Sequence, residues 1–163
     1  MNLKEFENTS ALDIALADEV SKRLKESIDL QGSASLVVSG GRTPLGFFHT
    51  LSQQDLDWSK VVVSLADERW VESDHKDSNE KLVRENLLIN NASQAQFFAL
   101  KNSAETAVDG CAELEESLAK MDAFTVVILG MGDDGHTASL FPGTPTLEVG
   151  LNMESDLNCV AVT

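Results

Sequence analysis

Apolar residues recur at every fourth position near the start of the chain, and this spacing predicts an amphipathic helix. Ser10 opens the segment, and Asp13 follows three residues later at the spacing of a capping box. The apolar face of the helix is then formed by Leu12, Leu16, Val20, Leu24 and Ile28. Gly32, in the stretch "QGS", is expected to end the helix, since glycine readily leaves the helical conformation.

Short apolar runs alternate with further helical patterns along the rest of the chain. Buried strands are predicted at residues 34–38 ("ASLVV"), 61–66 ("VVVSLA") and 124–130 ("FTVVILG"). Helices are predicted at residues 45–51, 78–88 and 107–118, the last one capped by Asn102 with Glu105. Because apolar strands alternate with helices, the sequence predicts an α/β fold: a mostly parallel sheet with helices on both faces.

The length of the chain fits one domain. At 163 residues and 17.6 kDa it is large enough to bury a core without disulfides or metals. Residues 159–163 look like a further strand, and no helix follows to cover that side of the sheet. Residues 1–163 are therefore expected to form a single α/β domain that is truncated at its C-terminus.

The net charge of the chain limits the classes of partner that can be expected. Twelve lysines and arginines stand against 27 acidic residues, for a formal net charge of −15. A field of this sign repels nucleic acids and anionic lipids, so neither a nucleic acid nor a membrane is an expected partner. The sequence shows no signal peptide and no long apolar run, and a cytoplasmic location is expected. Any anion site must be made locally, from backbone N–H groups and a few arginines.

Three irregular loops follow the predicted strands, and each carries polar residues. "SGGRTP" contains Gly40, Gly41, Arg42 and Thr43 before a helix, an arrangement that favours binding of an anion. "DER" places Asp67, Glu68 and Arg69 at the end of the second strand, where a carboxylate beside a guanidinium can orient hydroxyl groups or form a solvated ion pair. Because ligands of parallel sheets sit beyond the carboxyl ends of the strands, the three loops together predict a binding site.

The third loop, "GMGDDGH", admits two interpretations. Its glycines match the G-x-G-x-x-G pattern of a dinucleotide-binding turn, but two aspartates would face the pyrophosphate, and the motif comes in the third strand unit instead of the first. The alternative is an acid–base pair in which Asp134 orients His136. We favour that pair over a structural cap. A metal site is not expected, because no second histidine or cysteine lies nearby.

These three segments, quoted as "SGGRTP", "DERWVESDHKDSNEKLVRENLL" and "GMGDDGHTASLFPG", resemble the 6-phosphogluconolactonase family. The resemblance spans residues 39–143. It implies a fold similar to the glucosamine-6-phosphate deaminase and ribose-5-phosphate isomerase type. It also implies hydrolysis of 6-phosphogluconolactone, a phosphorylated sugar lactone, to 6-phosphogluconate in the pentose phosphate pathway, without a metal or an organic cofactor.

The resemblance also implies roles for individual residues. His136 would be the general base that activates water, and Asp134 its partner. Gly40, Gly41, Arg42 and Thr43 would belong to the phosphate- or sugar-binding loop, and Asp67 and Arg69 would line the same pocket. Members of the family usually continue past this point with a segment that brings a lysine and an arginine to the site. The resemblance therefore implies that the C-terminal part is lacking and that the isolated chain has weak or no turnover.

Two other functions stay open. The related glucosamine-6-phosphate deaminases carry a catalytic glutamate five residues after the corresponding histidine, where this sequence has Phe141. A deaminase-like isomerase is therefore the second choice. A non-catalytic module that binds sugar phosphates is the other alternative.

Overall fold

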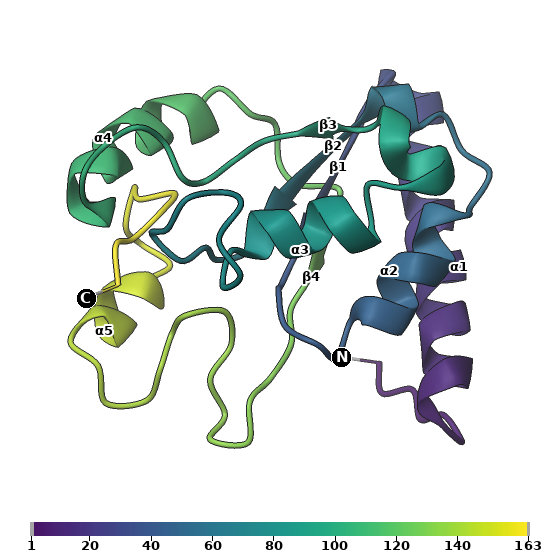
Figure 1. The fold of residues 1–163 in the computed structure, drawn as a ribbon, viewed down its shortest axis with the longest axis horizontal. Coiled ribbons are helices and arrows are strands. Elements are labelled where there is room, and N and C mark those ends of the chain that lie inside the picture. The colour runs from purple at the N-terminus through teal and green to yellow at the C-terminus, as the bar shows by residue number, and fades with distance from the viewer. Residues whose placement is uncertain (1, 163) are drawn as a thin grey trace.

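A four-stranded parallel sheet forms the centre of the protein in this computed structural model, which describes residues 2–162 (Figure 1). The strands are β1 (Ala34–Val38), β2 (Val61–Leu65), β3 (Gln96–Phe97) and β4 (Val126–Ile128). Their order is β3-β2-β1-β4, and every neighbouring pair is parallel. The three predicted strands are confirmed. The two residues of β3 are too few to give a sequence pattern, and this edge strand was not predicted.

One face of the sheet packs against the helices α1 (Thr9–Gln31), α2 (Leu45–Ser52) and α3 (Asn79–Asn86). Side chains alternate between the two faces of a strand, so every second strand residue points toward these helices. Leu36 and Val63 from the strands are fully buried together with Leu24 of α1, Phe48 of α2 and Val83 of α3. This layer contains the hydrophobic core.

Two short 3₁₀ helices complete this layer: η1 (Trp58–Lys60) and η2 (Asn90–Gln94). The indole of Trp58 in η1 is almost wholly buried in the core, and its Nε1 donates to the carbonyl oxygen of Gln54 at 3.1 Å. Trp58 therefore anchors the turn that leads into β2.

The ends of α1 show one correct and one wrong expectation. The Oδ1 atom of Asn8 accepts a hydrogen bond from the Ala11 N–H at 2.9 Å, so Asn8 caps the helix. The predicted capping box of Ser10 and Asp13 is wrong, because Ser10 lies inside the first turn. Gly32 ends the helix as predicted: its φ angle of 85° closes the last turn, and its N–H donates to the Ile28 carbonyl.

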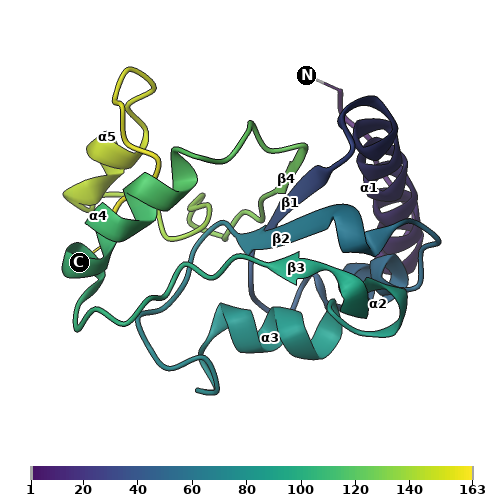
Figure 2. The ribbon, with the colours of Figure 1, turned by 90° about the horizontal axis from the view of Figure 1, so that it is seen from above.

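The other face of the sheet is loosely covered. The helices α4 (Ala107–Leu118) and α5 (Thr146–Gly150) lie to one side of the sheet, away from α1 and α2 (Figure 2). A cavity of about 850 Å³ separates Val37 and Val127 of the sheet from Leu114 of α4. Val127 is 46% exposed. Helices thus lie on both sides, as predicted, but only one side is tightly packed.

Two expectations in this second layer are wrong. Thr106 caps α4 by accepting a hydrogen bond from the Asp109 N–H at 3.2 Å, so the predicted cap of Asn102 with Glu105 is wrong. Residues 159–162 form no strand; Thr163 lies outside the described residues.

The apolar run at 159–162 lies beside α4 instead of extending the sheet. Glu115 of α4 accepts hydrogen bonds from the N–H groups of Asn158 and Cys159, each at 2.8 Å. A run of apolar residues becomes a strand only beside a strand partner. None pairs with this run in the part of the chain that the structure describes.

Candidate active site

The three polar loops leave the carboxyl ends of three neighbouring strands. β1 lies between β2 and β4, so the loop at residues 39–44 lies between the loop that begins at Asp67 and the loop that holds His136. Figure 1 shows the loops after β1 and β4 leaving the same lower edge of the sheet. The parallel topology therefore brings the predicted site residues to one edge, although they are up to 96 positions apart in the sequence (His136 minus Gly40).

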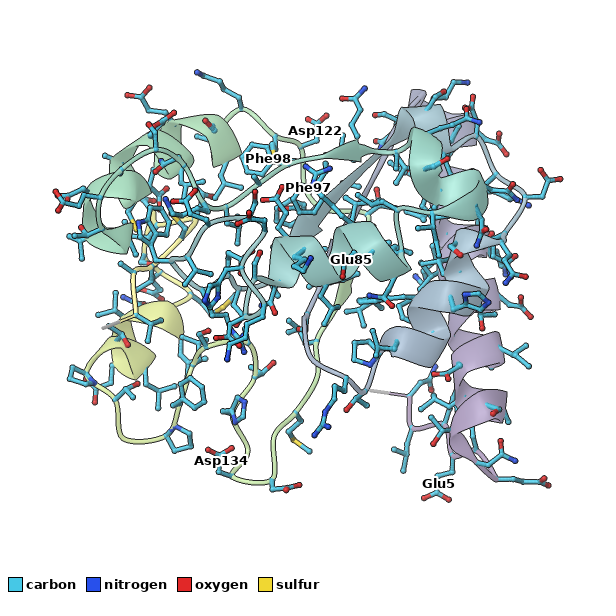
Figure 3. The ribbon with its side chains drawn as sticks, in the orientation of Figure 1. Glu5, Glu85, Phe97, Phe98, Asp122 and Asp134 are labelled. Carbon is cyan, nitrogen blue, oxygen red and sulfur yellow. The ribbon has the colours of Figure 1, made fainter. Side chains whose placement is uncertain are left out.

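His136 and Asp134 contact each other directly. The His136 Nδ1 lies 2.5 Å from the Asp134 Oδ1, and the backbone N–H of His136 donates to the same oxygen at 3.1 Å. The side-chain hydrogen bond from His136 is the main cause that lowers the pKa of Asp134 below its ordinary value. Asp134 is therefore ionised at neutral pH and can only accept hydrogen bonds. Figure 3 shows Asp134 at the lower edge of the molecule.

This contact selects the tautomer of the histidine. Because a carboxylate only accepts, the Nδ1 of His136 carries the hydrogen, and the Nε2 of the neutral ring carries the free lone pair. The His136 side chain is 31% exposed, and within residues 2–162 no group forms a hydrogen bond with its Nε2. The lone pair is therefore available to a water molecule or to a substrate.

Glycines make the tight loop around His136 possible. Gly135 has a φ of 84°, a conformation that side chains other than glycine rarely adopt. The N–H of Gly132 donates to the His136 carbonyl at 2.8 Å, and a Cβ atom on Gly132 would lie only 2.2 Å from the histidine ring. On another side the ring of Phe141 stacks against the imidazole, with centroids 4.4 Å apart. The imidazole is therefore held in place by neighbouring groups on more than one side.

The loop after β1 exposes backbone groups and one positively charged side chain. Gly41 has a φ of 95°, and Gly40 packs so closely on Asn79 that a Cβ atom there would lie 1.9 Å from the Asn79 Oδ1. Arg42 is exposed and forms no ion pair with any described residue. Pro44 precedes α2 without a capping side-chain hydrogen bond. The positive end of α2 and a guanidinium are thus both available to an anion.

The loop after β2 places Asp67 and Arg69 differently from the ion pair that their sequence spacing suggests. The Oδ2 of Asp67 accepts a hydrogen bond from the Ser139 hydroxyl at 2.6 Å. The Nη1 of Arg69 donates to the Asp77 carbonyl at 2.8 Å. Among the described residues, no salt bridge joins Asp67 to Arg69. Asp67 therefore ties its loop to the loop of His136, and Arg69 is held by its own loop.

Three residues that join the loops were not predicted as site residues. Ser139 reaches Asp67 from the loop of His136, and the buried Asn79 donates from its Nδ2 to the Asp67 carbonyl at 2.9 Å. Glu68 accepts hydrogen bonds from the first N–H groups of α3. Glu68 stands between the two predicted residues of "DER", and this position could have identified it as a site residue. Ser139 and Asn79 lie 72 and 12 positions from Asp67, and nothing in the sequence pattern links them to it.

The large cavity touches this site only in part. Asp67, Arg69 and Ser139 contribute to its lining, but His136, Asp134 and residues 40–43 do not. Most of its lining is apolar, from the open face of the sheet, α4 and the chain segment near residue 160. The cavity therefore adjoins the acid–base pair through the loops that hold Asp67 and Ser139.

The two cysteines lie by this cavity as free thiols. The Sγ of Cys159 lies 3.8 Å from the carbonyl oxygen of Cys111. Burial above all, with the neighbouring Cys111 and Glu115, raises the pKa of Cys159 to about 12. The Cys159 thiol is therefore protonated at neutral pH and is a poor nucleophile.

Two kinds of feature are absent from the described residues. Within residues 2–162, no group of three or more histidine, cysteine, aspartate and glutamate side chains is arranged to hold a metal ion. No helix in the same part of the chain combines the length and the apolar character needed to cross a membrane.

Comparison with known sequences identifies close relatives. The family model described as "Glucosamine-6-phosphate isomerases/6-phosphogluconolactonase" matches residues 7–163. The 6-phosphogluconolactonase of Rhizobium meliloti (strain 1021) is 51% identical over 152 residues, and that of Pseudomonas putida is 42% identical over 160 residues. These alignments cover 93% and 98% of this chain but 66% of each relative. The chain therefore spans just under two thirds of the length of these curated relatives.

Solved structures agree with the sequence relatives. A crystal structure of a 6-phosphogluconolactonase from Shewanella baltica OS155 matches with a TM-score of 0.93 and 50% identity, over 98% of this chain and 68% of that one. A monomeric glucosamine-6-phosphate deaminase matches with a TM-score of 0.72 at 21% identity, over 88% of this chain and 61% of that one, which shows a shared fold. The predicted fold class and the resemblance to the lactonase family are both confirmed.

Proposed function

Since the chain belongs to the family of glucosamine-6-phosphate isomerases and 6-phosphogluconolactonases, we propose that it serves to hydrolyse 6-phospho-D-glucono-1,5-lactone to 6-phosphogluconate. The reaction is a step of the pentose phosphate pathway. The observation that carries the proposal is the contact of His136 with Asp134, which leaves the Nε2 lone pair free at the edge where the three loops meet.

His136 acts as the general base in the proposed mechanism. Its Nε2 takes a proton from water as the water oxygen attacks the lactone carbonyl carbon, and Asp134 steadies the imidazolium that forms. The tetrahedral intermediate then collapses: the bond from the carbonyl carbon to the ring oxygen breaks, and the ring oxygen receives the proton from the imidazolium. Atoms balance with one water consumed, and no redox step is needed.

The loop after β1 binds the negative groups of the substrate. The N–H groups at the start of α2 carry no side-chain cap, and Arg42 has no anionic partner among the described residues. Glu68 already occupies the corresponding position on α3, so that helix end is not available to substrate. We therefore assign Gly40, Gly41, Arg42 and Thr43 to the phosphate or sugar and place Asp67 and Arg69 on the wall of the same pocket.

Phe141 argues against the deaminase alternative. At the position where the deaminases carry their catalytic glutamate, this chain has an aromatic ring that packs on His136 at 4.4 Å between centroids. A phenyl ring cannot transfer a proton to an opening sugar ring. The site supplies one acid–base pair, which is enough for hydrolysis of a lactone.

Lactonase turnover tests the proposal directly. The assay uses freshly generated 6-phosphogluconolactone, corrected for spontaneous hydrolysis, and the protein as its gene encodes it. His136→Ala should lower kcat by about 10²- to 10⁴-fold, the usual contribution of a general base. His49→Ala is the matched control, because His49 is an exposed histidine on α2 whose side chain contacts Gln53. Unchanged turnover in His136→Ala would remove the proposed base.

The same assay separates the alternatives. Binding of 6-phosphogluconate without turnover would indicate a non-catalytic binding module, and release of ammonia from glucosamine 6-phosphate would indicate a deaminase. Residues 1–163 alone are expected to turn over weakly or not at all, since the relatives are longer by about a third of their length. The single-domain organisation with a truncated end, the cytoplasmic location and the lack of nucleic-acid partners stay predictions.

A further inference from the structure

The carboxylate of Glu68 bridges both ends of the loop between β2 and α3. Its Oε1 accepts hydrogen bonds from the N–H groups of Arg69 and Asn79, each at 2.7 Å. Its Oε2 accepts from the Glu80 N–H at 2.8 Å and from the Ser78 hydroxyl at 3.2 Å. One of these donors follows β2 and the other three start α3, so a single side chain closes the loop.

The negative charge of Glu68 suits this position. The first N–H groups of a helix have no partner within the helix, and the helix dipole favours an anion there. Both carboxylate oxygens are used, and each accepts two hydrogen bonds. A glutamine of the same shape would offer one oxygen and would turn its NH₂ group toward backbone N–H groups. The charge and both oxygens are therefore needed to close the loop.

Arg69 is held at two points of this closed loop. Its backbone N–H donates to Glu68, and its Nη1 donates to the Asp77 carbonyl at the far end of the same loop. Arg69 is nevertheless exposed, and its guanidinium keeps further N–H donors. An arginine held in this way loses little conformational entropy when it binds an anion, since part of its freedom is already removed.

We propose that Glu68 is a positioning residue for Arg69: it orients the guanidinium toward the negative oxygens of the substrate without touching the substrate itself. The proposal rests on the proposed function, in which Arg69 lines the pocket for a phosphorylated sugar. Glu68 takes no part in proton transfer, because all its hydrogen bonds run to donors of its own loop and of α3.

A double-mutant cycle tests this relation. The probe is 6-phosphogluconate, and calorimetry gives its Kd for the protein as its gene encodes it. Glu68→Gln should weaken binding by about tenfold, because charge-assisted hydrogen bonds are lost. In an Arg69→Met background the same change should have almost no effect on Kd, since the arginine that Glu68 orients is gone. Equal weakening in both backgrounds would mean a general structural role and would overturn the proposal.

A second measurement does not depend on the proposed function. Nitrogen-15 relaxation of the Arg69 Nε–Hε group reports the mobility of the guanidinium without any ligand. Glu68→Gln should make this group clearly more mobile, whereas Glu72→Gln, which removes an equal charge from an exposed position of the same loop, should not. If the wild-type protein binds no sugar phosphate, the proposed function fails, and this measurement still decides the positioning. Unchanged mobility of Arg69 in Glu68→Gln would overturn it.

Discussion

The part of the chain before β3 is packed much more tightly than the part that follows β3. Among the described residues, every buried apolar side chain lies before residue 93 except Leu114 and Val126. The later part exposes large apolar groups, among them Phe124, Val127 and Leu129, along a cavity of about 850 Å³. Yet the proposed base lies in this looser part and the proposed anion loop in the compact part. The site therefore joins a tightly packed half to a half with few buried apolar side chains.

The largest expected difference in stability concerns two phenylalanines. Phe48 is fully buried, and Phe48→Ala should lower the free energy of unfolding by about 3–5 kcal/mol because it leaves a cavity in the core. Phe124 is 41% exposed beside the cavity, so Phe124→Ala should cost about 1 kcal/mol or less. Urea unfolding measures both. Similar losses for the two variants would show that the halves are equally well packed.

Two glycine substitutions should affect different properties of the protein: one its stability and the other its catalysis. Gly40→Ala pushes a methyl group into the buried Asn79, which is fixed by its bond to the Asp67 carbonyl, and should destabilise the protein by about 1–3 kcal/mol. Gly132→Ala displaces the ring of His136 within an exposed loop and should lower lactonase kcat by about 10²-fold with little loss of stability.

Thermal unfolding and lactonase kinetics on the same samples check this contrast between the two glycines. If Gly132→Ala instead unfolds the protein while it spares kcat per folded molecule, the loop of His136 is structural and not catalytic.

The ionisation of Asp134 gives a third test. The hydrogen bond from His136 lowers the pKa of Asp134, so His136→Ala should return that pKa toward its ordinary value. A carboxyl group with a lowered pKa in the folded state stabilises the fold above its unfolded pKa, and this contribution is lost as the pH falls through the lowered value. His136→Ala should therefore remove most of this contribution, and lowering the pH through this range should reduce its stability less than that of the wild type.

Carbon-13 NMR of the Asp134 carboxyl group follows this titration in both proteins. Asp133→Asn is the control, because Asp133 neighbours Asp134 but forms no hydrogen bond with His136 among the described residues. An Asp134 pKa that is the same with and without His136 would mean that the two side chains do not interact in solution.

The smallest effect is expected on the open face of the sheet. Leu129 is 54% exposed, and Leu129→Ser should change the free energy of unfolding by about 0.5 kcal/mol or less. Urea unfolding measures this as well. A loss of several kcal/mol would mean that this face is covered in solution, and the contrast between the two halves would then be smaller than the structure indicates.

Much of the fold could be predicted because its signals are local. Apolar runs predicted β1, β2 and β4. Apolar residues at every fourth position predicted α1, and Gly32 predicted where it ends. The capping residues were harder to predict, since Asn8 and Thr106 compete with nearby polar residues whose spacing is equally suitable. The two-residue strand β3 is too short to leave a pattern, because its position depends on pairing with β2.

The sequence by itself determined the alternation of strands and helices and the chemistry of the three loops, because residue type and spacing carry both. The contact of His136 with Asp134 spans only two positions and could be inferred. The tertiary structure alone decided that Asp67 binds Ser139 instead of Arg69, and that Glu68 closes the end of α3. The first contact joins residues 72 positions apart and exists only once the parallel strands have brought their loops to one edge. The second needs the connection between β2 and α3 to fold back on itself.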